Sequence, residues 1–228
     1  MVFLRARWEN LILLNYAVER ELLAPYLPEG CELDLRDGKP WLSLVAFQFL
    51  ETRVLGVPWP GFIHFPEVNL RFYVRHREKR AVCFIREYVP SRIVAGMARL
   101  LYNEPYSSAR MKAEIARKDD LLHVGYSLDQ RGHTLRLGVT ARAEPMTPPE
   151  SSVEHFFKEH DLGVGRDRRG KTLTYRVEHP VWRVYPVMNF SAHVSTELYG
   201  ERFSFLGSRS PDSAFLAEGS AITVSTAE

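Results

Sequence analysis

The sequence predicts a mainly β (α+β) fold, built as a large curved antiparallel β-barrel or cone with a few short helices. Two observations support this prediction. Ten or more segments of the 228-residue chain alternate apolar and polar residues with a period of two, which is typical of strands. Only three segments have the pattern of a short helix, which is too few for the crossovers of a parallel sheet, and closure removes the exposed edges of a many-stranded sheet.

The first half of the chain is expected to hold five strands and two helices. Asp37-Gly38 is a strong hairpin signal, so the strand before this turn is expected to pair with the strand after it. Ser91 fits the N-cap of the second helix. The expected strands are 8–16, 31–36, 41–54, 67–75 and 81–88, and the expected helices are 19–26 and 92–102.

The second half begins with more strands and contains one further helix. Ser151 is expected to cap this helix, which ends near His160. The proline-rich stretch 145–149 is interpreted as a loop, so residues 1–228 are expected to form one domain. The expected strands are 106–116, 121–127, 134–143, 172–178, 182–195, 202–206 and 215–225.

Composition narrows the class of protein. Hydrophobic residues make up 45% and charged residues 25%, which is typical of a globular chain rather than a disordered one. A net charge of +2 is too small to predict nucleic-acid binding. The chain has no apolar run long enough for a membrane span, no secretory signal and only two cysteines, so we expect a reduced, cytoplasmic protein with no membrane partner.

One segment matches a phosphate-binding pattern in the wrong context. Residues 165–172 fit G-x-x-x-x-G-K-T, but the mechanism requires a strand before the loop and a helix after it. Here a helix is expected before and a strand after, so we predict a surface connection. His155 and His160 are five residues apart, which does not place two imidazoles on one helical face, and we expect neither a metal nor a cofactor.

Two strands have polar residues along one face. A set of carboxylate, amide, guanidinium and phenol groups can bind an anion and transfer protons if these faces line a lumen. The alternative is that both faces meet water on a half-exposed sheet. The first stripe is Glu67, Asn69, Arg71 and Tyr73, and the second is Tyr106, Ser108, Arg110 and Lys112.

Several segments, namely 41–47, 66–74, 98–100, 105–111 and 179–182, give the chain a family resemblance. It resembles the bacterial uncharacterised proteins grouped as domain-of-unknown-function family 2071, within the acetoacetate-decarboxylase-like superfamily. The resemblance implies a curved β-barrel around a polar cavity, with both stripes inside. In acetoacetate decarboxylases a proline precedes two lysines, the first of which forms a Schiff base. The matching residues here are Tyr106 and Ser107 after Pro105, so the catalytic lysine is absent, whereas Glu67 corresponds to a glutamate that positions the substrate.

We therefore expect a protein that binds a small anionic molecule in a polar cavity. Glu67 is the candidate acid/base or anchor, and Arg71 and Arg110 would hold the anion. Asn69, Tyr106 and Ser108 would supply hydrogen bonds.

Two other functions remain open. One is a lyase or decarboxylase with a relocated catalytic group, either Glu67 or Lys112, which is the only lysine on an expected strand; Lys158 is expected on the exposed side of its helix. The other is a partner-binding protein that uses aromatics around Trp59 in the loop 56–66. A homo-oligomer is also possible.

Overall fold

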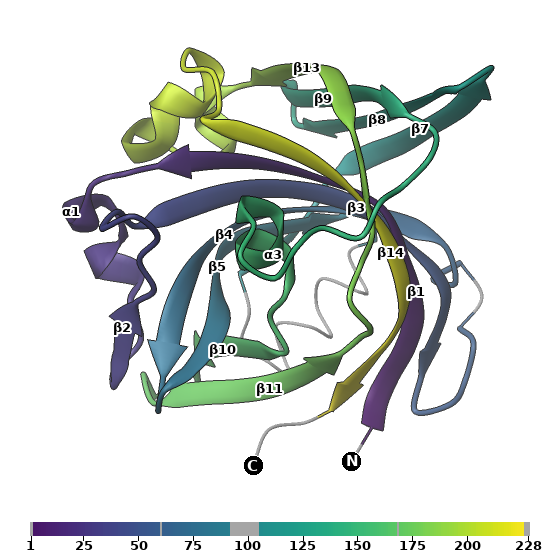
Figure 1. Cartoon of the computed structure of the whole chain (residues 1–228). Helices are drawn as coiled ribbons and strands as arrows, with labels where there is room; N and C mark the ends of the chain where they lie inside the picture. The colour runs from purple at the N-terminus through teal and green to yellow at the C-terminus, as the bar shows by residue number, and fades with distance from the viewer. Residues whose placement is uncertain (1, 60, 92–104, 168, 226–228) are drawn as a thin grey trace.

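The computed structural model describes residues 2–59, 61–91, 105–167 and 169–225. Fourteen strands in this part of the chain form two sheets (Figure 1). The larger sheet contains β1 (Val2–Ala17), β2 (Cys31–Leu33), β3 (Trp41–Val54), β4 (Phe65–His76), β5 (Lys79–Val89), β6 (Tyr106–Ser108), β10 (Leu162–Arg166), β11 (Thr172–Glu178), β12 (Val184–Tyr185) and β14 (Ser213–Ser225). The smaller sheet contains β7 (Arg110–Lys118), β8 (Leu121–Gln130), β9 (His133–Arg142) and β13 (Val187–Val194).

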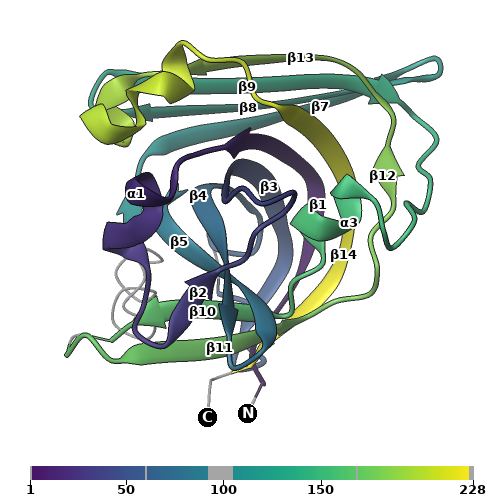
Figure 2. The same cartoon turned by 60° about the vertical axis from the view of Figure 1, so that its left-hand side comes forward.

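The larger sheet is strongly curved. Its strand order is β2-β4-β3-β1-β14-β11-β10-β5-β6, with β12 paired to β14. Because β4 also pairs with β5, strands near the two ends of this order are hydrogen-bonded to each other. Figure 2 looks into the concave side of this sheet, and the smaller sheet, in the order β13-β9-β8-β7, lies across its outside.

The helices in the described part of the chain are short. They are α1 (Arg20–Leu23), η1 (Ala24–Tyr26), α3 (Val153–Lys158), η2 (Thr196–Leu198) and η3 (Glu201–Gly207). None of the described helices is long and apolar enough to cross a bilayer. The prediction of a mainly β chain, with a curved sheet and few helices, is confirmed. The helix expected over 92–102 lies outside the described residues.

The faces of β4 pack into two different cores. Val68, Leu70 and Phe72 point outward and share a core with Val124 and Leu137 of the smaller sheet. The side chains between them point to the concave side. The smaller sheet covers the outer face of β4, and the larger sheet curves around its inner face, so β4 is buried on both sides. Its polar stripe therefore lies inside the protein.

The expected strand 106–116 is two strands in different sheets. β6 pairs in parallel with β5, whereas β7 pairs with β8, and Ala109 lies between them. The expected strand 182–195 divides in the same way at Pro186, because β12 pairs with β14 and β13 with β9. Alternation continues through both junctions in the sequence, so it does not reveal the change of sheet.

Three smaller predictions are also wrong. β2 pairs with β4 rather than β3, because the turn at Asp37-Gly38 closes only an isolated bridge between Arg36 and Lys39. Residues 202–206 form part of η3 rather than a strand, since they turn between the two sheets. The N-cap of α3 is Ser152 rather than Ser151, and its hydroxyl accepts the His155 backbone N–H at 3.1 Å.

The phosphate-pattern segment joins β10 to β11 as a hairpin. No strand was expected before it, so the prediction that a helix leads directly into the connection is wrong. The Asp167 carboxylate accepts the backbone N–H groups of Arg169 at 2.8 Å and Lys171 at 2.9 Å. Because the Asp167 side chain already takes these donors and a strand follows, the described residues of this loop, 165–167 and 169–172, form no phosphate cradle.

Candidate functional site

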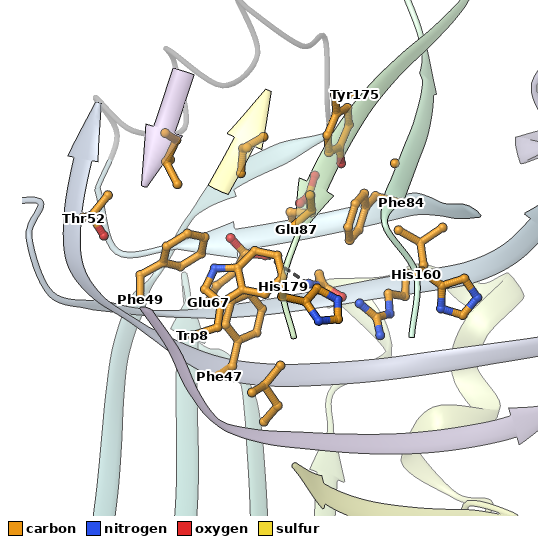
Figure 3. A pocket seen from close by; sticks show the side chains of 18 of the residues that line it. Trp8, Phe47, Phe49, Thr52, Glu67, Phe84, Glu87, His160, Tyr175 and His179 are labelled. Carbon is orange, nitrogen blue, oxygen red and sulfur yellow. Dashed lines mark hydrogen bonds between the residues drawn. The ribbon is translucent and has the colours of Figure 1, made fainter. Parts of the chain in front are cut away.

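A cavity of about 230 Å³ lies on the concave side of the larger sheet (Figure 3). Most of its lining is apolar. Trp8 makes edge contacts with Phe47, Phe49 and Trp182, at centroid distances of 5.0, 5.6 and 6.1 Å. We call the following residues the aromatic wall: Trp8, Phe47, Phe49, Phe65, Phe84 and Trp182.

A glycine shapes one side of this cavity. Gly163 on β10 pairs with Tyr175 on β11, and both line the cavity. A Cβ on Gly163 would lie 2.2 Å from Cζ of Tyr175, so any side chain there would displace the ring. Gly163 therefore makes room for an aromatic ring over the sheet.

The polar part of the lining comes from three adjacent strands. The register places Asn69 of β4 opposite Glu87 of β5, and Glu87 opposite Tyr106 of β6. Asn69 Nδ2 donates to Glu67 Oε1 at 3.0 Å, and the Tyr106 hydroxyl donates to Glu67 Oε2 at 3.2 Å. Tyr106 also has a hydrogen bond with Glu87, so one phenol lies between two carboxyl groups.

The environment of Glu67 favours its neutral form. The residue is 3% exposed, and burial raises its pKa from 4.5 to about 7, although the hydrogen bonds from Asn69 and Tyr106 and the charge of Arg71 act in the opposite direction. Burial, followed by the charges of Glu67 and Glu87, raises the pKa of Tyr106 well above its usual value. Glu67 is therefore able to gain or lose a proton near neutral pH, whereas Tyr106 keeps its proton.

Arg71 is a buried cation in the lining. Its Nη2 donates to the Phe157 carbonyl oxygen at 3.1 Å, and its guanidinium carbon lies 5.9 Å from the ring centroid of Tyr73. Within the described residues, Arg71 Nε and Asn69 Oδ1 are buried without a hydrogen-bond partner. Leaving such a group unpaired costs about 1–3 kcal/mol, so a ligand that pairs with them would remove this penalty.

Several polar lining residues were not expected from the sequence, among them Glu87, Lys158, His160 and His179. Lys158 was expected to be exposed, but its side chain is only 2% exposed and Nζ donates to the Glu159 carboxylate. The reason is that α3 is so short and lies so deep in the concave side that Phe156, Phe157 and Lys158 are all buried. A helix of six residues, fewer than two turns, with none of its residues exposed has no exposed side that a periodicity of 3.6 could identify.

His160 follows α3 and is buried in the lining. Burial, and then the charges of Arg80 and Arg71, hold its pKa well below the usual value, so the imidazole is neutral. Neither ring nitrogen has a hydrogen-bond partner among the described residues.

His179 lies at the cavity, where its ring stacks on Trp182 with a centroid distance of 4.1 Å. Its Nδ1 lies 2.9 Å from the Pro180 carbonyl oxygen. A carbonyl oxygen can only accept, so Nδ1 carries a hydrogen and donates this hydrogen bond. The segment 179–182 was quoted for its family resemblance, but no role was inferred for it.

The structure brings together four of the six expected site residues. Glu67, Asn69, Arg71 and Tyr106 all line the cavity. Ser108 and Arg110 are not among its lining residues.

The expected position of Arg110 is wrong, because the chain enters the smaller sheet after Ala109. Its side chain is 87% exposed and lies 3.5 Å from Asp129. Lys112 is exposed on the same strand, and Ser108, opposite Val89 in the register, is half-buried. The lining among described residues also holds no group of three or more His, Cys, Asp or Glu side chains arranged for a metal ion.

Solved structures with similar folds are known. An acetoacetate decarboxylase-like enzyme from Sphingomonas wittichii RW1 matches with a TM-score of 0.66 and 13% identity, over 98% of this chain and 91% of that one. Acetoacetate decarboxylase from Legionella pneumophila matches with a TM-score of 0.67 and 13% identity, over 98% and 85%. The enduracididine biosynthesis enzyme MppR, complexed with pyruvate, matches with a TM-score of 0.70 and 12% identity, over 98% and 90%. At these identities the similarity shows that the fold is acetoacetate decarboxylase-like.

Sequence comparison gives a more specific result. The uncharacterized protein YqjF of Bacillus subtilis (strain 168) is 26% identical over 180 residues, which are 78% of this chain and 74% of that protein. A family model described as an uncharacterized conserved protein matches residues 5–221. Because the match covers most of its length, this chain belongs to the domain-of-unknown-function family 2071, a family of uncharacterized conserved proteins.

Proposed function

We propose that this protein binds a small anionic molecule whose acidic head pairs with Arg71 and whose apolar body lies against the aromatic wall. The observation that supports this most directly is a set of buried polar atoms in the cavity that have no hydrogen-bond partner. Arg71 Nε, Asn69 Oδ1 and both nitrogens of His160 are buried without partners within the described residues, and all three side chains line the same cavity. Unpaired donors and acceptors that meet at one apolar cavity are typical of a ligand site.

The size of the cavity limits the ligand. An apolar protein cavity of roughly 150 Å³ holds a benzene molecule. At about 230 Å³, this cavity has room for a ring of that size with a short acidic chain. The fold match to MppR complexed with pyruvate supports an acidic ligand of small size.

Binding of phenylacetate tests the proposal. Native mass spectrometry of the purified protein first shows whether a small molecule is retained, and calorimetry then measures phenylacetate affinity. Arg71→Lys keeps the charge but removes the planar fork of donors, so we expect affinity to fall by about ten- to a hundredfold.

Arg110→Lys is the matched control, since Arg110 is exposed on the smaller sheet. It should leave affinity unchanged, and melting curves should show that both variants fold. Equal affinity in wild type and Arg71→Lys, or no binding of phenylacetate by the wild type, contradicts the proposal.

A second candidate function is a lyase that uses Lys158. The observation that favours it is a lysine whose buried side chain lines an apolar cavity and is ion-paired with one carboxylate, Glu159. The amine would add to a substrate carbonyl and lose water to form an imine. The protonated imine nitrogen then accepts the electron pair of a broken carbon–carbon bond.

Borohydride trapping separates the two candidates. If Lys158 forms an imine with pyruvate, reduction leaves a stable secondary amine, and peptide mapping places one adduct on Lys158. Lys158→Arg should abolish this adduct, whereas Lys112→Arg, on the exposed strand β7, should not. An unchanged mass favours binding without covalent chemistry.

A further inference from the structure

We infer that the cavity takes monocarboxylates and that each one binds together with a proton on Glu67. This inference rests on the proposed function and adds to it the charge class of the ligand and a proton that enters with it. It follows from the charges that surround the cavity and from the hydrogen bonds of Glu67.

The cavity offers one cation for an anionic head. Lys158 is ion-paired with Glu159, and His160 is neutral, so Arg71 is the cation whose donors remain incompletely used among the described lining residues. Two carboxyl groups, Glu67 and Glu87, lie in the same lining. The titratable and charged groups that line the cavity with Glu67 are Arg71 on β4, Glu87 on β5, Tyr106 on β6, Lys158 at the end of α3, His160 after it, Tyr175 on β11, and His179. Glu159 is paired with Lys158.

A carboxylate ligand beside Arg71 places a negative charge close to Glu67. Arg71 is four residues from Glu67 on the same face of β4, with Asn69 between them, and both line the cavity. The charge of Arg71 acts on Glu67 and lowers its pKa, so the two groups are close enough to interact. Repulsion between like charges in a site shielded from water is strong. The free energy is lowered when Glu67 binds a proton, because the pair then becomes a carboxylic acid and a carboxylate, and the acid can donate a hydrogen bond to the ligand.

The surroundings of Glu67 suit this neutral form. Its pKa of about 7 means that the free protein already holds the proton in about half of its molecules at pH 7. The Tyr106 hydroxyl can turn its hydrogen toward Glu87, with which it also interacts, when Glu67 is protonated. The second carboxyl group thus keeps the phenol satisfied after Glu67 has gained its proton.

The same charge count disfavours dianions. One guanidinium and one proton compensate the negative charges of Glu67 and of a monocarboxylate, while Glu87 is a further carboxyl group in the same lining. A second ligand carboxylate would remain uncompensated inside an apolar cavity. We therefore expect phenylsuccinate, which is phenylacetate with an added carboxylate arm, to bind at least about tenfold more weakly than phenylacetate.

Calorimetry in buffers of different ionisation enthalpy measures the proton directly. Phenylacetate is fully ionised at pH 7 and pH 8, so protons taken up come from the buffer to the protein. We expect uptake of about half a proton per ligand at pH 7, rising toward one at pH 8, because Glu67 titrates near pH 7. Phenylacetamide, the neutral analogue, should bind without proton uptake.

Glu67→Gln is the diagnostic variant, because glutamine resembles the protonated acid and keeps a partner for Asn69 and Tyr106. It should bind phenylacetate with no proton uptake and with an affinity that does not fall between pH 7 and pH 8. Glu114→Gln, on the exposed face of β7, is the matched control and should behave like the wild type.

Two results overturn the inference while leaving the proposed function intact. One is phenylacetate binding with Arg71 dependence but zero proton uptake at both pH values. The other is equal or tighter binding of phenylsuccinate. Absence of binding by every probe overturns the proposed function itself, so the two failures are distinguishable.

Discussion

Two polar stripes that look alike in the sequence have different positions in the molecule. On β4, Glu67, Asn69 and Arg71 are all buried on the concave side of the larger sheet. In the segment 106–112 only Tyr106 reaches the cavity, whereas Arg110 and Lys112 are exposed on the smaller sheet. The difference arises at one residue, Ala109, where the chain leaves the first sheet for the second.

This comparison shows how far strand alternation can be used. A period of two assigns residues to a common face only while the strand stays in one sheet. It does not say whether that face meets water. β4 is buried on both faces because a second sheet covers its outside, and this covering is a property of the assembled fold.

The largest expected effect comes from the outer face of β4. Leu70→Ala removes a side chain that is fully buried between the two sheets, so it should lower the free energy of unfolding by about 2–5 kcal/mol. Because Leu70 points away from the cavity, phenylacetate affinity of the folded protein should not change. Urea unfolding and calorimetry measure the two quantities, and a large loss of affinity would show that the faces of β4 are not independent.

The next largest effect is the pH dependence of the free energy of unfolding, which depends on Glu67 on the inner face of β4. The folded protein raises the pKa of Glu67 from 4.5 to about 7, so the unfolded chain loses this proton at lower pH than the folded one. Between about pH 4.5 and pH 7 the folded state binds more protons, and the free energy of unfolding therefore falls as pH rises, by about 3 kcal/mol in total. This stabilisation is fully present below pH 4.5 and absent above pH 7.

Glu67→Gln removes that ionisation. The stability of the variant relative to wild type should therefore increase across this pH window, whereas Glu114→Gln should give the wild-type curve. Denaturation at several pH values measures the difference. A constant difference across the window would show that the fold does not favour the neutral acid.

Tyr106→Phe is expected to have a smaller effect. It removes the hydroxyl that donates to Glu67 Oε2 at 3.2 Å, at a cost of about 1 kcal/mol. Because this hydrogen bond lowers the pKa of Glu67, its loss should move the pH transition upward. Ser108→Ala, on the same short strand but outside the cavity lining, serves as the control; an identical pH profile in both variants would contradict the role given to Tyr106.

The smallest effect belongs to the exposed stripe. Arg110→Gln should change the free energy of unfolding by less than about 0.5 kcal/mol, because the side chain is 87% exposed and its contact with Asp129 is a surface ion pair. Chemical denaturation of Arg71→Gln, measured in parallel, gives the contrast between the stripes, because this variant removes one of the two hydrogen bonds that the Phe157 carbonyl oxygen accepts, the other coming from the Tyr73 hydroxyl. Equal free energies of unfolding for Arg110→Gln and Arg71→Gln would contradict the difference between the exposed and the buried stripe.

The sequence by itself determined the fold class and one half of the site. The alternation along 67–75 identified Glu67, Asn69 and Arg71 as sharing a face, because side-chain direction along a strand is a local property. The sequence after Gly165 and Lys171 also ruled out a phosphate loop, because it alternates as a strand where that loop requires a helix.

Only the tertiary structure decided which polar residues meet. The change of sheet at Ala109 separates Tyr106 from Arg110, and the same change at Pro186 separates β12 from β13. Lys158, His160 and His179 reach the cavity from α3 and from the segment before β12, far from β4 in the chain. Their positions depend on long-range packing against the concave side of the sheet, and a local pattern of polar and apolar residues carries no information about such contacts.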